Sequence, residues 1–237
     1  MDIENKITAQ KDVFLTEQLI LQAKKDIRRQ IKEKLNLRKN ISGLNESDSK
    51  KACSLLSDSE IYKKANMILA YMPMPEEVDI TPIIKNALIL GKYAAVPRII
   101  NGTNDMDFYL LKNAKSGREI GKDFENQFDR GIFGIREPKE CLKKLSLSDI
   151  RKASYDTGCL VLVPALAFER SGARLGRGKG FYDKFLSALK GSPVISCGVC
   201  FNFQILDSVP TETNDFAVDY ILSEMSLQNT KRIFAAI

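Results

Sequence analysis

Residues 172–183 read Gly-Ala-Arg-Leu-Gly-Arg-Gly-Lys-Gly-Phe-Tyr-Asp, and they link an apolar, strand-like run over residues 159–168 to a helix-like pattern ending at Leu189. Three glycines remove side chains at alternate positions of this turn: Gly176, Gly178 and Gly180. Three cations lie among them: Arg174, Arg177 and Lys179. Such a turn can bring backbone N–H groups and positive charge against a polyanion at a helix N-terminus. The segment therefore predicts a phosphate site.

The spacing of the glycines excludes two common phosphate loops. A Walker loop has four residues between its first glycine and Gly-Lys-Ser/Thr, whereas five residues separate Gly172 from Gly178 and Gly180 replaces the hydroxyl residue. The dinucleotide fingerprint is G-x-G-x-x-G, whereas this segment reads G-x-G-x-G. A plain strand-to-helix turn remains the alternative, and the interleaved cations favour a binding role over it.

Apolar runs typical of strands alternate along the chain with helical patterns. Strands are predicted over residues 67–72, 93–96, 106–111, 160–163, 194–199 and 218–222. Helices are predicted over residues 47–64, 81–90 and 181–189, and residues 112–153 read as irregular structure with a short helix. This alternation predicts a single α/β domain with three α/β/α layers and a mainly parallel, doubly wound sheet. Ligands of such sheets bind at the carboxyl ends of the strands, where we expect the glycine-rich segment to lie.

A further helix is predicted near the N-terminus from apolar residues that recur every four positions. These residues are Leu15, Leu19, Ala23, Ile27, Ile31 and Leu35, and the stripe is expected to pack on the core. Lys24 and Arg28 stand four apart on this helix, so their cationic ends share one face and can reach one phosphate chain. Residues 24–39 hold eight Lys and Arg against two acidic residues. This basic face is either a solvated surface or a site for an anionic ligand.

Composition narrows the chemistry that the chain can carry. The 237 residues include no histidine, so Ser–His and Cys–His nucleophilic schemes and histidine metal sites are excluded. The net charge of +6 suits an anionic ligand. Five cysteines without framework spacing indicate free thiols in a reducing compartment, and Cys197 and Cys200 would face opposite sides of one strand. No membrane span or secretory signal is visible, so we expect a cytoplasmic protein.

The glycine-rich segment also resembles the signature of the 5-formyltetrahydrofolate cyclo-ligase family, also called methenyltetrahydrofolate synthetase. The matching blocks are Val163–Phe168, Arg174–Asp183, Lys24-x-x-x-Arg28, Pro75–Asp79, Asn104–Phe108, Gly134–Pro138, Phe201–Gln204, and Val209–Pro210 followed by Asn214–Asp215. They run over about residues 24–224, nearly the whole chain. The resemblance implies a cyclo-ligase α/β domain over residues 24–237, preceded by an N-terminal helical extension over residues 1–23.

The activity that the resemblance implies is the ATP- and Mg²⁺-dependent conversion of 5-formyltetrahydrofolate to 5,10-methenyltetrahydrofolate. Phosphorylation of the formyl oxygen and attack by N10 of the same folate would release ADP and phosphate. The nucleophile belongs to the substrate, so a chain without histidine can carry out this reaction by positioning reactants and stabilising charge. We expect a monomer that binds the folate with or without a polyglutamate tail, and neither nucleic acid nor membrane.

The resemblance further implies a role for each matching residue. The ATP-binding set is Lys24, Arg28, Arg174, Leu175, Gly176, Arg177, Gly178, Lys179, Gly180, Phe181 and Tyr182. The folate-binding set is Met72, Glu77, Arg177, Gly178, Lys179, Gly180 and Phe181. The catalytic set is Arg177, Lys179 and Tyr182, and Mg²⁺ would be held by Asp183 and Asp215.

These roles agree with the chemistry of the side chains. A carboxylate such as Glu77 can accept two hydrogen bonds from the 2-amino and N3 edge of a pterin. Two aspartates suffice for Mg²⁺, which keeps waters and phosphate oxygens as its other ligands. Simpler interpretations also exist: a helix-start acid for Asp183, a core methionine for Met72, and helix packing for Phe181.

The chain departs from the family pattern at two positions. Asn214 stands where many bacterial members have histidine, and Phe181 replaces a frequent tyrosine, so a hydroxyl role cannot apply there. Two other functions remain open from the sequence. The basic helix over residues 24–39 would suit a non-catalytic RNA-binding protein on the same fold. The phosphate loop would also suit a nucleotide-dependent kinase or a carbohydrate-phosphate enzyme.

Overall fold

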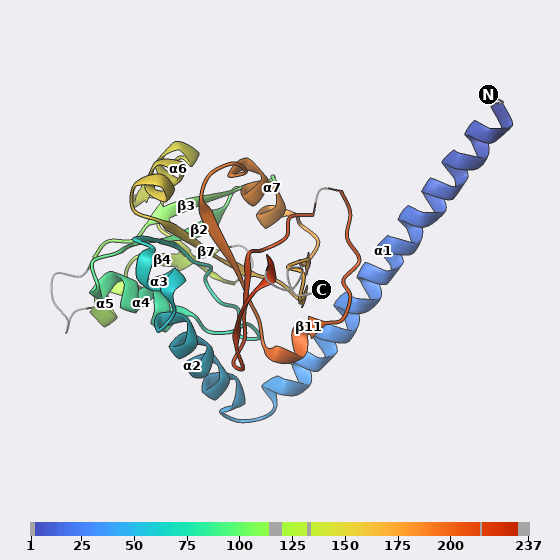
Figure 1. The fold of residues 1–237 in the computed structure, drawn as a ribbon. Helices are drawn as coiled ribbons and strands as arrows, with labels where there is room; N and C mark the ends of the chain where they lie inside the picture. The colour runs from blue at the N-terminus through green and yellow to red at the C-terminus, as the bar shows by residue number, and fades with distance from the viewer. Residues whose placement is uncertain (1–2, 114–119, 132–133, 214, 232–237) are drawn as a thin grey trace.

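The protein is an α/β domain built on one eight-stranded sheet (Figure 1). The computed structural model describes residues 3–113, 120–131, 134–213 and 215–231, with residues 3–14 and 120–122 described by their backbone alone. The helices are α1 (Ile3–Lys39), α2 (Leu44–Ser57), α3 (Glu60–Lys64), α4 (Thr81–Ile89), α5 (Ile120–Glu125), α6 (Leu147–Asp156) and α7 (Phe181–Ala188). The strands are β1 (Met67–Leu69), β2 (Tyr93–Ile99), β3 (Met106–Leu110), β4 (Phe128–Arg130), β5 (Arg136–Pro138), β6 (Lys143–Lys144), β7 (Cys159–Pro164), β8 (Ala167–Glu169), β9 (Arg174–Leu175), β10 (Val194–Val199), β11 (Ile205–Leu206), β12 (Tyr220–Leu222) and β13 (Leu227–Asn229).

The sheet is mainly parallel and doubly wound, as the alternation of strands and helices predicts. Its strand order is β13-β12-β10-β7-β1-β2-β3-β6. The five strands from β12 to β2 pair in parallel, while β13, β3 and β6 add antiparallel edges. The chain passes from β1 outward to β2, and from β7 outward in the other direction through β10 to β12. The winding therefore reverses between β1 and β7, the place where open α/β sheets bind their ligands.

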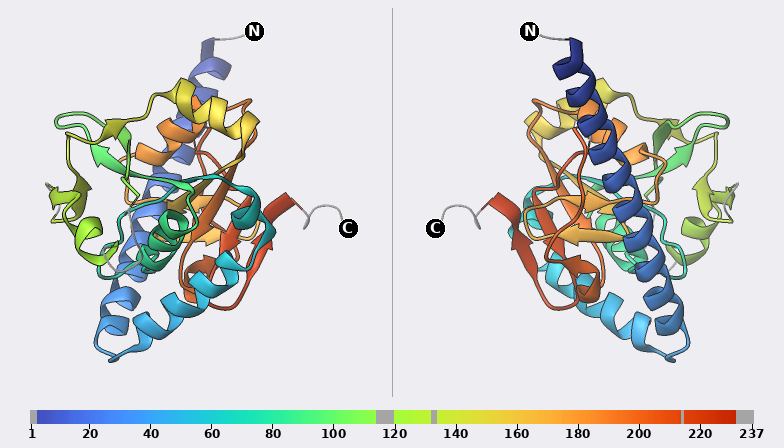
Figure 2. Two further views of the ribbon diagram at one scale, coloured as in Figure 1. Left: turned by 90° about the vertical axis from the view of Figure 1, so that its left-hand side faces the viewer. Right: turned by 90° about the vertical axis from the view of Figure 1, so that its right-hand side faces the viewer.

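Successive residues of each central strand pack into two separate cores, one on each face of the sheet. This arrangement produces the three layers. Ile68 of β1 and Leu160 of β7 belong to a core that α1, α2, α3 and α4 cover. Leu69 and Val161, the next residue in each strand, belong to a second core that α6 and α7 cover. Figure 2 shows the strands between α2 on one side and α6 and α7 on the other. Side chains of a strand alternate between faces, so both faces of these strands are buried.

Helix α1 is one continuous helix, and only its C-terminal part packs on the core. Ile31 and Leu35 are fully buried, whereas Leu15 and Leu19 are 57 % and 63 % exposed. The predicted stripe is therefore wrong for Leu15 and Leu19, because residues before about 20 extend past the edge of the sheet (Figure 1). The helix continues through the proposed boundary between residues 23 and 24. Among the described helices, none combines the length and the apolar character needed to cross a membrane.

Several predicted elements are divided differently in the structure. The helix predicted over residues 47–64 is two helices, because the Ser59 hydroxyl accepts the N–H of Tyr62 and starts α3. The apolar run over residues 159–168 also splits, into β7 and β8. Strand β8 pairs with β9 in a hairpin, so this hairpin stands between β7 and the glycine-rich loop. Residues 112–153 hold more order than predicted, since β4 and β5 form a hairpin there and α5 and α6 flank it.

The cysteines behave as the sequence predicts. All five carry free thiols, and four of them are buried. Cys197 packs in the first core and Cys200 in the second, so the two thiols face opposite sides of the sheet. The C-x-x-C spacing therefore brings no two sulfur ligands together here.

Candidate active site

A cavity of about 580 Å³ opens where the winding of the sheet reverses. Its floor includes Tyr71 and Met72 after β1, Pro97 and Ile99 of β2, and Pro164 at the end of β7. All residues of the predicted site line this one cavity, from four separate parts of the chain: Lys24, Arg28, Met72, Glu77, Arg174, Leu175, Gly176, Arg177, Gly178, Lys179, Gly180, Phe181, Tyr182, Asp183 and Asp215.

The glycine-rich loop crosses the cavity under the side chain of Arg28. Nε of Arg28 donates a hydrogen bond to the carbonyl of Gly176 at 3.0 Å. Gly178 has φ of 99°, and a Cβ there would lie 3.6 Å from the Arg28 guanidinium carbon. Gly180 has φ of 71° and precedes α7 with no side-chain cap, so the first N–H groups of α7 lack a capping side chain. This arrangement places cations and backbone donors around one anion-sized space.

Asp183 and Asp215, the two predicted metal ligands, are each paired with a buried cation. Oδ1 of Asp183 accepts Nη2 of Arg174 at 2.6 Å and the N–H of Phe216 at 3.0 Å. Oδ2 of Asp215 accepts Nζ of Lys24 at 2.6 Å. Burial lowers the pKa of Arg174, and the nearby Asp183 acts in the opposite direction. The two cations are only 5 % exposed, so each aspartate neutralises a charge that would be costly to bury alone.

The donor set at these aspartates is compatible with Mg²⁺. In each carboxylate one oxygen receives the donors just described, and the described residues place no hydrogen bond on the other, Oδ2 of Asp183 or Oδ1 of Asp215. Two carboxylate oxygens that line one cavity match the preference of Mg²⁺ for few protein oxygens plus waters and phosphate. The residue before Asp215, Asn214, lies outside the described residues.

Arg177 links the glycine-rich loop to the loop that follows β1. Its Nη2 lies 3.1 Å from Oε1 of both Glu76 and Glu77. Oε2 of Glu77 accepts the N–H of Met74 at 3.0 Å, and Oε2 of Glu76 lies 3.4 Å from Nζ of Lys39. Burial raises the pKa of Glu77, although Arg177 and the Met74 N–H oppose this shift. Nε and Nη1 of Arg177 bind no described residue, so they remain available to a ligand.

The hydroxyl of Tyr182 is buried in the cavity wall without a hydrogen-bond partner, alone in this among the buried side-chain polar atoms of the described residues. Burial raises the pKa of this phenol, with Glu77 adding to the shift, so Tyr182 is a neutral hydrogen-bond donor. A buried, unsatisfied hydroxyl costs about 1–3 kcal/mol, which a ligand atom could recover. Tyr182 is one of the three residues predicted from the sequence to be catalytic.

The remaining predicted residues differ in how freely they face the cavity. Lys179 is exposed and forms no ion pair with any described residue. Met72 is buried against the first core and also lines the cavity, so the core and substrate-wall interpretations are compatible. Phe181 is half-buried at the start of α7.

Other residues of the wall were not predicted from the sequence. They are Leu21, Tyr71, Met74, Pro97, Ile99, Met106, Ile135, Arg136, Glu137, Pro164, Ala165 and Glu212. Ile135, Arg136 and Glu137 lie in the block over residues 134–138, which supported the family resemblance without receiving a role. That block was the signal that could have identified them.

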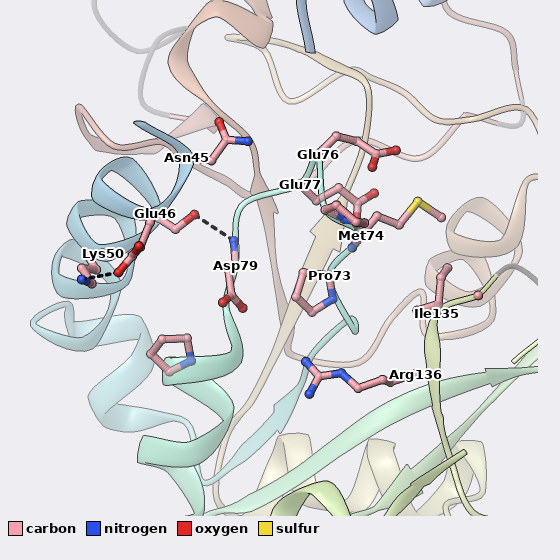
Figure 3. Close-up of a pocket in the computed structure, with 14 residues that line it drawn as sticks. Asn45, Glu46, Lys50, Pro73, Met74, Glu76, Glu77, Asp79, Ile135 and Arg136 are labelled. Carbon is pink, nitrogen blue, oxygen red and sulfur yellow. Dashed lines mark hydrogen bonds and ion pairs between the residues drawn. The ribbon is translucent and has the colours of Figure 1, made fainter. Parts of the chain in front are cut away.

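A second cavity of about 760 Å³ lies behind the loop over residues 73–79 (Figure 3). Asn45, Glu46 and Lys50 of α2 form one side, and Arg136 reaches toward Pro73 from β5. The two cavities share Met74, Glu77, Ile135 and Arg136. The loop after β1 therefore separates the two cavities and lines both of them.

Comparison with known proteins identifies the family. The model of the 5-formyltetrahydrofolate cyclo-ligase family matches residues 20–224. The chain belongs to this family. It is 28% identical to the mouse 5-formyltetrahydrofolate cyclo-ligase, with 86% of this chain and 95% of the mouse protein covered. The enzyme of that name from Mycolicibacterium smegmatis is 32% identical, with coverage of 66% and 72%.

The fold agrees with a solved member of the family. The NMR structure of 5,10-methenyltetrahydrofolate synthetase from Aquifex aeolicus superposes with a TM-score of 0.66 and 27% identity, covering 88% of this chain and 93% of that one. The predicted fold class and the family resemblance are thus both confirmed.

Proposed function

We propose that the protein converts 5-formyltetrahydrofolate to 5,10-methenyltetrahydrofolate, with ATP as co-substrate and Mg²⁺ bound to the ATP phosphates. The observation that carries this proposal is that one cavity holds every residue for which family membership implies a role. The free thiols are compatible with a cytoplasmic location.

The chemistry needs positioning and charge stabilisation more than a protein nucleophile. The formyl oxygen attacks the γ-phosphorus of ATP and ADP leaves, which turns a poor leaving group into a phosphate ester. N10 of the folate then attacks the formyl carbon, the N10 proton is lost, and phosphate departs with the former formyl oxygen. Cations that meet the transferring phosphoryl group lower the barrier by neutralising its charge.

Within this proposal, the cationic residues of the cavity hold the triphosphate. Arg177 offers Nε and Nη1, and Lys179 is unpaired among the described residues, so both can meet the transferring group. Asp183 and Asp215 would hold Mg²⁺, which neutralises phosphate charge when it is bound. Met72 and Glu77, in the wall that follows β1, would contact the folate.

The proposal is tested by incubating the purified protein with 5-formyltetrahydrofolate and Mg-ATP. Methenyltetrahydrofolate absorbs in the near ultraviolet where the substrate does not, and we expect absorbance to rise only when ATP is present. Protein that binds both ligands but produces no such rise would refute the activity. ADP release with other acceptors would instead favour a kinase, and salt-sensitive RNA binding without turnover would favour the RNA-binding alternative.

Replacing Tyr182 by Phe is expected to lower kcat/KM about tenfold, or ~1.4 kcal/mol of transition-state stabilisation. The hydroxyl has no protein partner, so a ligand atom is its natural acceptor. For the same reason the melting temperature should stay equal or rise. An unchanged kcat/KM would show that the Tyr182 hydroxyl has no role in the reaction. A lower melting temperature would assign the lost activity to lost stability instead.

A further inference from the structure

Glu137 is a buried carboxylate without a hydrogen-bond donor. The residue is 6 % exposed, and no described N–H or O–H group lies within hydrogen-bond distance of its carboxylate. The nearest cation is Nε of Arg98 at 4.0 Å, which is too far for a hydrogen bond. Arg98 directs its other N–H groups to the carbonyl of Pro138 at 2.8 Å and to Glu140 at 3.1 Å. The Tyr182 hydroxyl is the one fully enclosed and unpartnered polar atom among the described side chains, so the Glu137 oxygens still reach the solvent of the cavity.

The position of Glu137 shows where the missing donors would come from. Glu137 lies in β5 and lines the cavity of the candidate active site. Its neighbours in that wall are apolar side chains of β2, β3 and the approach to β5: Pro97, Ile99, Met106 and Ile135. These side chains supply no N–H or O–H donor, so the donors for the carboxylate come from water or from a ligand in the cavity.

The other glutamate near this wall, Glu77, is half-buried and already has protein partners. One oxygen of Glu77 receives the Met74 N–H, and the other receives Arg177. Glu137 therefore has more free acceptor capacity than Glu77 in this structure. Of these two glutamates, Glu137 is the better preorganised acceptor for N–H groups of a ligand.

The local structure also holds the carboxylate in place. Gly131, after β4, donates its N–H to the carbonyl of Ile135 at 2.8 Å and closes the β4–β5 hairpin. A Cβ at residue 131 would lie 2.3 Å from Cδ of Glu137, so the Glu137 side chain occupies the space that only glycine leaves open. The hairpin thus fixes the carboxylate against the cavity with little rotational freedom.

We propose that Glu137 binds the N–H edge of an amino-substituted nitrogen heterocycle, with the apolar wall of β2 and β3 packing on the ring. The inference rests on the proposed function, and both proposed substrates carry such a ring, the pterin of the folate and the adenine of ATP. A pterin offers adjacent 2-amino and N3 donors, which match two free carboxylate oxygens. Adenine offers its 6-amino group alone.

The test measures the binding of each ligand separately by calorimetry, with 5-formyltetrahydrofolate alone and a non-hydrolysable ATP analogue with Mg²⁺. Glu137→Met removes both acceptors while keeping the side-chain volume, and we expect the Kd of one ligand to rise at least tenfold. Glu137→Gln keeps one acceptor, so its Kd for that ligand should lie between the Kd of Glu137→Met and the Kd of the wild type. If both Kd values stay within twofold of the wild type, the proposal is wrong, whatever the activity assay shows.

Analogues identify the ring. If the ring is adenine, the wild type should prefer the ATP analogue over its inosine counterpart, which lacks the 6-amino group, and Glu137→Met should lose this preference. If it is the pterin, the same loss should occur between the folate and its 2-desamino analogue. Retention of both preferences in Glu137→Met would overturn the proposal.

Two further variants separate ligand binding from a structural role. Glu140→Met is the matched control, because Glu140 contacts the same Arg98 but is 76 % exposed and lies outside the cavity wall; its Kd values should match the wild type. Gly131→Ala should displace the carboxylate and raise the same Kd that Glu137→Met raises. Glu137→Met removes a largely buried charge that has no hydrogen-bond donor among the described residues, so its melting temperature should stay equal or rise. A lower melting temperature with equal weakening of both ligands would show that Glu137 is structural.

Discussion

Replacing Asp183 by Asn is expected to lower the free energy of unfolding by about 3–5 kcal/mol, because it leaves a buried arginine without its counter-charge. The side chain of Arg174 is 3 % exposed, and its short contact with Asp183 is its one ion pair among the described residues. The same substitution removes a proposed Mg²⁺ ligand, so kcat/KM should fall at least tenfold. Urea denaturation and steady-state kinetics with Mg-ATP would measure the two effects.

A double variant separates these two effects of Asp183. Combining Asp183→Asn with Arg174→Met also removes the buried positive charge, so most of the lost stability should return. Activity should not return, because the carboxylate oxygen proposed for Mg²⁺ and the Arg174 guanidinium proposed for ATP are both missing. If the double variant recovered activity together with stability, Asp183 would be a counter-ion and would have no part in metal binding.

Replacing Arg177 by Ala should lower kcat/KM at least tenfold with little loss of stability. Arg177 is proposed to meet the transferring phosphoryl group, and its contacts with Glu76 and Glu77 are partly solvent-exposed, so they add little to folding. Arg177→Lys keeps the charge but loses the planar fork, and it should recover only part of the activity. Steady-state kinetics against ATP and against the folate would show which substrate is affected.

The control for Arg177 is Glu76→Gln, which weakens one carboxylate contact and leaves every proposed phosphate ligand in place. Its kcat/KM should stay within about twofold of the wild type. An equal loss in Glu76→Gln and Arg177→Ala would assign the effect to the contact between the two loops, and the phosphate role of Arg177 would be wrong.

The overall fold could be predicted from the sequence because its central strands are continuous apolar runs separated by helical patterns. The ends of the individual helices and strands could not be predicted in this way. The hydroxyl of Ser59 caps α3 inside the single helix predicted over residues 47–64, a local hydrogen bond that hydrophobic periodicity does not record. The exposure of Leu15 and Leu19 depends on where the sheet ends beneath α1, which is a property of the tertiary structure.

The candidate site was also predictable only in part from the sequence. The sequence blocks that carry the family resemblance contain the predicted residues that meet in the cavity. They did not show that Asp183 and Asp215 neutralise buried cations, because the burial of Arg174 and Lys24 depends on the tertiary structure, and Lys24 lies far from Asp215 in the sequence. Glu137 was missed because it lies among charged residues in a segment that reads as irregular. Only the pairing of β4 with β5 buries its carboxylate against the cavity.

The distribution of the thiols makes the protein suitable for attachment of a fluorescent reporter. Burial raises the pKa of Cys53 and of Cys159 to about 12, and those of Cys197 and Cys200 also rise, so few thiolates form there. Cys141 is exposed, three residues beyond β5. A maleimide dye should therefore label the native chain once and the denatured chain at all five cysteines. Mass spectrometry would count the adducts, and a second native adduct would show that the core opens. A dye at Cys141 would stand beside the hairpin that carries Glu137, where its emission could follow ligand entry in real time.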